Sequence, residues 1–214
     1  MPEQQLCPAC GRPGEAPRPD SNGVGGRDSA PLTGGRRSMR DFARRLETAQ
    51  ALAGYTQADS ERVWASRELL LPHADAIAGA VYEHLLSHPE TAVHFTASDG
   101  RPDRAHLDVR EGSLKQWLAA TIEAPLDERF ATYLAGIGRA HTRRGGNPAV
   151  WVKGRYMLMT ISFAQTALLS LLDASIEDRA EFVATVGAWN KLLMIQLDMF
   201  LAVYGGAEGN PHWY

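Results

Sequence analysis

The residue with the clearest potential for chemistry is His141, which follows Ile137 by four positions and Leu134 by seven. This spacing places the three residues on one apolar helix face. Residues 145–148, Gly-Gly-Asn-Pro, stop a helix, so we predict His141 in its last turn. A neutral imidazole there can offer one ring nitrogen to iron while a carbonyl or carboxylate holds the other. A core histidine favoured by the helix dipole would show the same spacing.

A second candidate for chemistry is the pair Cys7 and Cys10, whose thiolates can bind one side of a tetrahedral zinc ion. A complete site would need a histidine such as His212, or the same motif from another copy of the chain. A redox-active or incidental pair is the alternative. Because the chain has two cysteines in all, no disulfide framework holds the fold, and we expect a reducing cytoplasm.

The composition excludes several classes of protein. The net charge of -3 and the pI near 6.2 predict no nucleic-acid partner, since duplex binding needs a basic face. The first residues lack the basic start and apolar stretch of a signal peptide. Residues 156–172 carry no charge, but they are interrupted by polar residues and are shorter than the roughly 20 that span a bilayer. We therefore predict a buried helix and no membrane span.

The chain of 214 residues suits one domain with tails. Residues 1–37 contain seven glycines and six prolines without apolar periodicity, which predicts a disordered tail. The domain follows over residues 38–204, and residues 205–214 form a short second tail. Five arginines cluster near the start of the domain: Arg36, Arg37, Arg40, Arg44 and Arg45. They are typical of a solvated basic face, with contact to a partner or anionic lipid as the alternative.

Helical periodicity runs through the domain, and no alternating run bounded by turns indicates a strand, so the predicted fold class is all-α. A capping-box pattern from Thr56 to Asp59 predicts the start of the second helix. We expect helices over 38–53, 56–71, 72–88, 89–95, 103–123, 127–144, 148–172 and 177–204. The final helix is apolar on more than one face, which indicates a place deep in the core or an interface with another subunit.

Four motifs, in order, resemble the globin domain of the globin-coupled sensors and protoglobins, over roughly residues 45–204. They are Gly54-Tyr55-Thr56-x-x-Asp59, Tyr82-x-x-Leu85-Leu86-x-x-Pro89-Glu90-Thr91, Ile137-Gly138-x-x-His141-x-x-x-Gly145-x-x-Pro148 and Asn190-Lys191-Leu192-Leu193-x-x-x-Leu197-Asp198. The resemblance implies a globin fold with an additional N-terminal helix before the first globin helix. It also implies haem b, with its iron bound by His141, and a homodimer through helices 148–172 and 177–204.

The resemblance assigns further residues to the cofactor. Tyr82 matches a tyrosine that faces bound gas in relatives, where its hydroxyl can hydrogen-bond to oxygen; core packing is the alternative. Phe95 would wedge the haem edge, although packing explains it equally well. Ile137 and Trp151 are the expected contacts on the His141 side.

Relatives often carry a second polar residue facing the ligand on the helix that matches residues 103–123. The candidates are Gly112, Ser113 and Gln116, of which we take Gln116 as the cofactor contact. A second axial ligand to iron is also open, with the candidates His84, His94 and His106. His106 is the first to check, because it lies on that same helix.

Two departures from the family pattern bear on function. Trp151 stands ten residues after the histidine, where relatives commonly have tyrosine, so a phenol cannot make a hydrogen bond there. Few residues follow Tyr204, and an output module needs on the order of 100. We therefore expect a stand-alone sensor of oxygen or redox state, which binds a diatomic gas (oxygen, with CO and NO as further candidates) and signals through a separate protein partner.

Two other functions share the same residues. One is a haem enzyme, either an NO dioxygenase or peroxidase-like; sensing is favoured over it because the chain has no flavin or nicotinamide motif to deliver electrons. The other is a haem-free helical dimeric adaptor.

Overall fold

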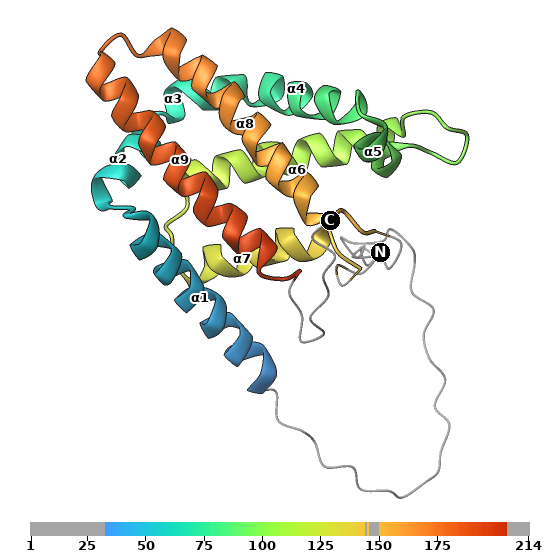
Figure 1. Ribbon diagram of the computed structural model, residues 1–214, viewed down its shortest axis with the longest axis horizontal. Helices are drawn as coiled ribbons and strands as arrows, with labels where there is room; N and C mark the ends of the chain where they lie inside the picture. The colour runs from blue at the N-terminus through green and yellow to red at the C-terminus, as the bar shows by residue number, and fades with distance from the viewer. Residues whose placement is uncertain (1–32, 144, 146–149, 205–214) are drawn as a thin grey trace, which may run out of the picture. The chain divides into compact units, whose positions relative to one another are not determined.

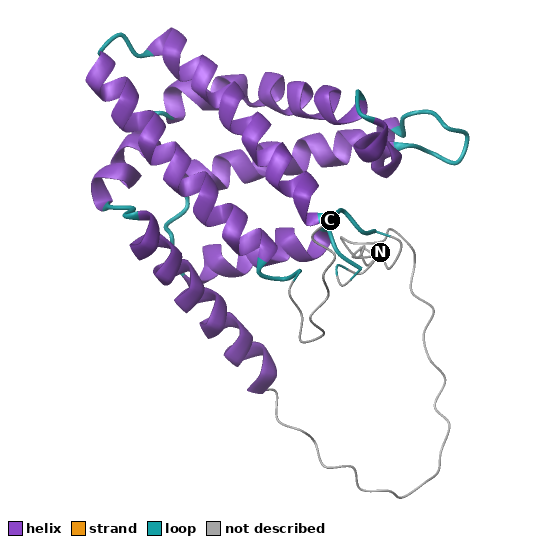
Figure 2. Ribbon diagram, in the orientation of Figure 1, coloured by secondary structure: helices purple, strands orange, loops and turns teal. Residues whose placement is uncertain are grey.

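The computed structural model describes residues 33–143, 145 and 150–204, and these form helices with no strand (Figures 1 and 2). The prediction of an all-α fold is confirmed. The predicted cysteine site, with Cys7, Cys10 and His212, lies outside the described residues, as do the tails over 1–32 and 205–214.

The helices follow the predicted order with shifted ends. They are α1 (Thr33–Ala53), α2 (Gln57–Ala65), α3 (Arg67–Leu70), the 3-10 turn η1 (Leu71–His73), α4 (Ala74–Leu86), α5 (Pro89–Ala92), the 3-10 turn η2 (Val93–Phe95), α6 (Arg104–Glu123), α7 (Glu128–Ala140), α8 (Gly154–Ser175) and α9 (Arg179–Leu201). Helix α1 begins five residues before Ser38, so residues 33–37 belong to a helix and not to the tail.

The first turn of the chain forms as its residue types predict. Gly54 ends α1 with φ +61°, a left-handed conformation that glycine adopts without steric cost. The side chain of Thr56 then accepts from the Asp59 backbone amide, and the Asp59 carboxylate accepts from the Thr56 amide. This reciprocal pair satisfies two amides that a helix start leaves open, and the predicted capping box is confirmed.

Helix α9 is the centre of the core, where it packs against α1, α2, α7 and α8 (Figure 1). It is buried on more than one face, as its apolar sequence predicts. Two tryptophan side chains tie it to other helices: Trp189 Nε1 donates to Ser66 Oγ at 3.0 Å, and Trp117 Nε1 donates to Gln196 Oε1 at 2.6 Å. Neighbouring helices in the same chain therefore cover most of the apolar surface of α9.

Helix α8 begins at Gly154, and residues 150–153 are not helical, so the prediction of a helix from Pro148 was wrong at its start. The helix is long and apolar enough to cross a membrane, but a single such helix is weak support for a span. The prediction that α8 is buried also needs correction. Its core face holds Met157, Ile161, Ala164, Leu168 and Leu172, while Leu158, Met159 and Leu169 are exposed.

Candidate functional site

Helix α7 presents His141 at its carboxyl end. The Asp127 side chain starts the helix by accepting from the Arg129 and Phe130 amides at 2.8 and 3.0 Å. The buried face of α7 includes Phe130, Leu134 and Gly138. His141 is the residue that caps the helix, one position beyond the last helical residue and not inside the last turn as predicted.

The His141 backbone is held from two sides. Gly138, one turn earlier, lies so close to α9 that a Cβ there would collide with the carbonyl oxygen of Phe200. On the other side, the backbone amide of Val152 donates to the carbonyl of His141 at 2.9 Å. Helix α7 is therefore packed closely on α9 one turn before the histidine, and His141 itself is bonded to the segment that leads into α8.

The imidazole of His141 has one occupied nitrogen and one without a partner. Nδ1 lies 2.9 Å from the carbonyl oxygen of Ile137. A carbonyl can only accept, so Nδ1 carries the proton and Nε2 keeps its lone pair. No other residue of the described part makes a hydrogen bond to Nε2.

The surroundings of His141 favour its neutral form. Burial lowers the pKa of the imidazole, the hydrogen bond to Ile137 opposes this, and the charges of Arg110 and His94 lower the pKa further. A neutral imidazole with a free Nε2 and a carbonyl-held Nδ1 has the donor chemistry of a metal ligand. No cluster of three or more metal-ligating side chains occurs among the described residues.

A second cluster joins α4, η2 and α6. The Tyr82 hydroxyl donates to the carbonyl oxygen of Arg110 at 3.2 Å, and the Tyr82 ring meets Phe95 edge-on at 5.4 Å between ring centres. Phe95 in turn lies 6.1 Å from the His106 ring, and Arg110 Nε lies 3.5 Å from His106 Nε2. Burial raises the pKa of Tyr82 to about 12, so this phenol keeps its proton at neutral pH.

Electrostatics link this cluster to His141. The charge of Arg110 contributes to the lowered pKa of His141 and also acts on the pKa of Tyr82. Arg110 is thus a charged residue whose electrostatic effect reaches both groups.

The structure brings some of the predicted site residues together and separates others. His141 contacts Ile137, and Tyr82 contacts Phe95. Trp151 packs against Tyr204 at 5.7 Å between ring centres and does not contact the Tyr82 cluster. Gln116 and Ser113 are exposed, while Gly112 is partly buried.

Of the three further histidines, two lie near the site. His94 is half-buried, its charge acts on His141, and its own pKa is lowered by burial. His106 belongs to the Tyr82 cluster, and burial and the charge of Arg110 lower its pKa. His84 stacks on Phe163 of α8, with 4.1 Å between ring centres.

The sequence reasoning missed Arg110. It lies three residues after Leu107 and four before Leu114, two apolar residues that face inward on α6. A charged residue on an apolar helix face was the signal that could have found it.

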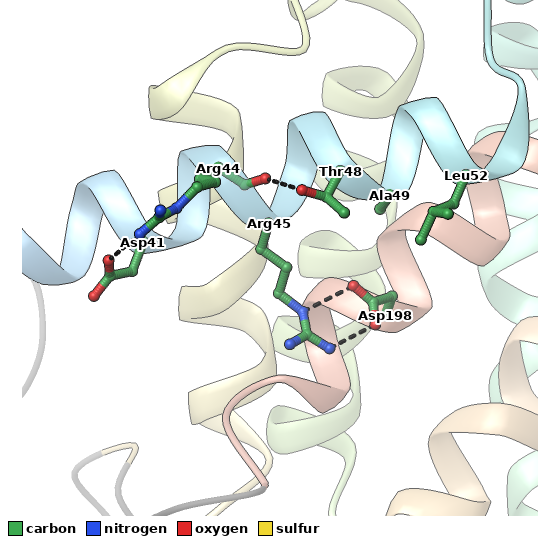
Figure 3. A pocket seen from close by; sticks show the side chains of 7 residues that line it. All are labelled: Asp41, Arg44, Arg45, Thr48, Ala49, Leu52 and Asp198. Carbon is green, nitrogen blue, oxygen red and sulfur yellow. Dashed lines mark hydrogen bonds and ion pairs between the residues drawn. The ribbon is translucent and has the colours of Figure 1, made fainter.

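A separate groove of about 600 Å³ lies between α1 and α9 and shares no residue with the histidine site (Figure 3). Arg45 spans it with a two-pronged ion pair to Asp198, at 2.6 and 2.8 Å. Its lining is Asp41, Arg44, Arg45, Thr48, Ala49, Leu52 and Asp198. No cluster of groups suited to catalysis or metal binding occurs in it.

An all-helical domain that holds one neutral histidine with a free Nε2 is compatible with the class of helical proteins that bind haem through histidine. The chain matches the Protoglobin family model over residues 42–208, and it belongs to that family. Family membership implies haem as the cofactor, and the free Nε2 of the neutral His141 fits an axial bond to its iron.

The fold agrees with a solved relative. The globin domain of the Geobacter sulfurreducens globin-coupled sensor matches with a TM-score of 0.64 and 23% sequence identity. The match covers 75% of this chain and 97% of that one. It supports the globin fold, with α1 as the additional N-terminal helix. None of the curated proteins matches the chain significantly.

Proposed function

We propose that this protein is a haem b globin that binds a diatomic gas beside Tyr82 and acts as a sensor of oxygen or redox state. His141 binds the iron through Nε2. The observation that carries the proposal is the hydrogen bond from His141 Nδ1 to Ile137, which leaves Nε2 as a neutral donor. Haem, when bound, supplies the iron to which a gas ligand can attach.

Tyr82 discriminates between gases by hydrogen bonding. Its hydroxyl is protonated and now donates to the Arg110 carbonyl. Turned toward a ligand, it would favour oxygen, whose outer atom gains negative charge on binding, over carbon monoxide, which gains less. The site therefore prefers oxygen. CO and NO can also bind, but each accepts a weaker hydrogen bond from the Tyr82 hydroxyl.

A signal would leave the domain through helices α8 and α9. We propose a homodimer through these helices, because exposed apolar side chains gather there: Leu158, Met159, Leu169, Val183 and Met194. The carboxyl end of α9 touches Gly138, one turn before His141. Through this contact, a change at the histidine helix would reach the dimer interface and, from there, a protein partner. We also predict that the protein is located in the cytoplasm.

A second candidate function is peroxide turnover, favoured by the pair of His106 and Arg110. A neutral imidazole can accept a proton, and a neighbouring guanidinium can stabilise negative charge. The 3.5 Å contact between their nitrogens places these two groups together. The test is the rate at which wild type and His106→Ala oxidise a phenolic dye with hydrogen peroxide. A peroxidase should be active as wild type and lose activity in His106→Ala, whereas a sensor should show little activity in either.

The first test is the absorption spectrum of the purified protein, reduced without oxygen and then exposed to it. We expect an intense Soret band that shifts with oxygen and that is lost or altered in His141→Ala. The matched control is His73→Ala, since His73 is exposed and lies in η1 away from the site. A wild-type protein without a Soret band after reconstitution with haem would overturn the proposal and leave a haem-free adaptor.

A further inference from the structure

Arg110 is a charged residue on the inward face of α6. The buried Leu107 precedes it by three positions, and Leu114, which packs against the core, follows by four. Its own side chain is partly buried. Helix α6 packs against α4, and the contact of Tyr82 with the Arg110 carbonyl fixes this part of α6 next to Tyr82.

The guanidinium of Arg110 has no negative partner in the described part of the chain. Four arginines there have partly buried side chains. Arg62 and Arg67 pair with Glu181 and Glu68, and Arg139 lies over the ring of Phe42. Arg110 has only the long contact of its Nε with the uncharged Nε2 of His106.

A partly buried cation without a counter-ion has donors available for a negative ligand. The guanidinium carries five N–H donors in a planar fork, and its two terminal nitrogens make no hydrogen bond to described residues. Arg110 Nε lies 3.5 Å from His106 Nε2, and the His106 ring lies 6.1 Å from Phe95, which packs edge-on against Tyr82. The guanidinium therefore belongs to the Tyr82 cluster, on the side of the site proposed to receive the gas.

We infer that Arg110 makes the gas side of the His141 site a receptor for small monoanions, such as azide or nitrite, when the iron is ferric. The inference rests on the proposed haem function and goes beyond it in the class of ligand. The guanidinium supplies the charge and two donors, and the Tyr82 hydroxyl supplies a third donor once it turns from the Arg110 carbonyl. A neutral ligand such as carbon monoxide gains little from this arrangement.

The test measures two affinities in the haem-loaded protein: azide for the ferric form and carbon monoxide for the ferrous form, each from the Soret shift. The variants are Arg110→Gln, Arg110→Lys and the control Arg104→Gln, since Arg104 is an exposed arginine on the same helix. We expect the azide Kd to rise at least tenfold in Arg110→Gln while the CO affinity changes less than twofold. The azide Kd of Arg110→Lys should lie between those of wild type and Arg110→Gln, because lysine keeps the positive charge but lacks the planar set of donors of a guanidinium.

A second readout separates an external anion from the carboxylate of a haem propionate, which has the same chemistry. The rate of haem loss to excess apomyoglobin is measured for each variant. Unchanged azide affinity with faster haem loss would mean that Arg110 holds a propionate, and the inference would be wrong. Equal losses of azide and CO affinity would mean a structural role, which also overturns it. Absence of a Soret band in wild type would instead overturn the proposed function.

Discussion

The hydroxyl of Tyr82 on α4 donates a hydrogen bond to the backbone carbonyl of Arg110 on α6, at 3.2 Å. Since that carbonyl belongs to a helix, it already accepts a bond within α6, and the tyrosine is an additional donor. The tyrosine can therefore leave this position without orphaning a backbone group. The same hydroxyl can therefore hydrogen-bond to α6 when no ligand is bound and to the ligand when one is present.

Replacing Tyr82 with phenylalanine should accelerate oxygen dissociation about tenfold or more, since a hydrogen bond to a charged acceptor contributes roughly 1.5–3 kcal/mol. Dissociation of carbon monoxide should change much less. The measurement is stopped-flow displacement of each gas from the ferrous protein. Tyr133→Phe, at an exposed residue of α7, is the control. Equal oxygen rates in wild type and Tyr82→Phe would show that the hydroxyl does not reach the ligand.

Replacing Gly138 with alanine should destabilise the protein by about 1–3 kcal/mol, because the new methyl group collides with the backbone of Phe200. The matched control is Gly136→Ala in the same helix, where a Cβ meets nothing within 4 Å. That change should be neutral or stabilising by up to about 1 kcal/mol, because alanine favours helix. Denaturation in guanidinium chloride gives both values. If both variants had the same stability, the close approach of α7 and α9 would be refuted.

Local signals in the sequence predicted the order of the helices. Gly54 and the Thr56–Asp59 pair mark the start of α2, and these signals act within a few residues. Ends set by tertiary contacts were harder to place. Helix α7 ends at Ala140, and the Val152 amide donates to the carbonyl of His141; no local residue indicates that contact.

The site was only partly predictable for a related reason. His141 and Tyr82 came from motif spacing, and the charge of Arg110 acts on both. The inward face of α6 was harder to assign, because polar residues lie all around the helix. The tertiary contacts decide it: they expose Gln116 and turn Arg110 inward.

Asp59 should make the stability depend on pH. Burial alone would raise its pKa, but hydrogen bonds from Thr56 and Lys191 and the Lys191 charge outweigh it, and the pKa is lowered. A carboxyl with a lowered folded-state pKa stabilises the fold above its unfolded pKa of about 3.9 and loses this contribution as pH falls through the folded value.

In Asp59→Asn, we therefore expect a loss of about 1–3 kcal/mol at pH 7 that shrinks below about pH 4. Urea denaturation between pH 7 and pH 3 measures the difference. Asp75→Asn is the control, because Asp75 pairs with Lys115 on the surface, where solvent screens the pair. A difference that stayed constant with pH would assign the loss to the helix cap and not to the charge.

The proposed dimer predicts that charges on the outer face of α8 dissociate it. Met159 is 57% exposed, and Leu158 beside it is 42% exposed. Met159→Glu would bury a carboxylate in an apolar interface, a cost of several kcal/mol that a dimer of ordinary affinity cannot offset. Sedimentation velocity should therefore show a wild-type dimer and a Met159→Glu monomer of unchanged helical content. Val109→Glu, at a 62% exposed residue of α6, should remain a dimer. A monomeric wild type at micromolar concentration would leave the apolar face of α8 to another partner.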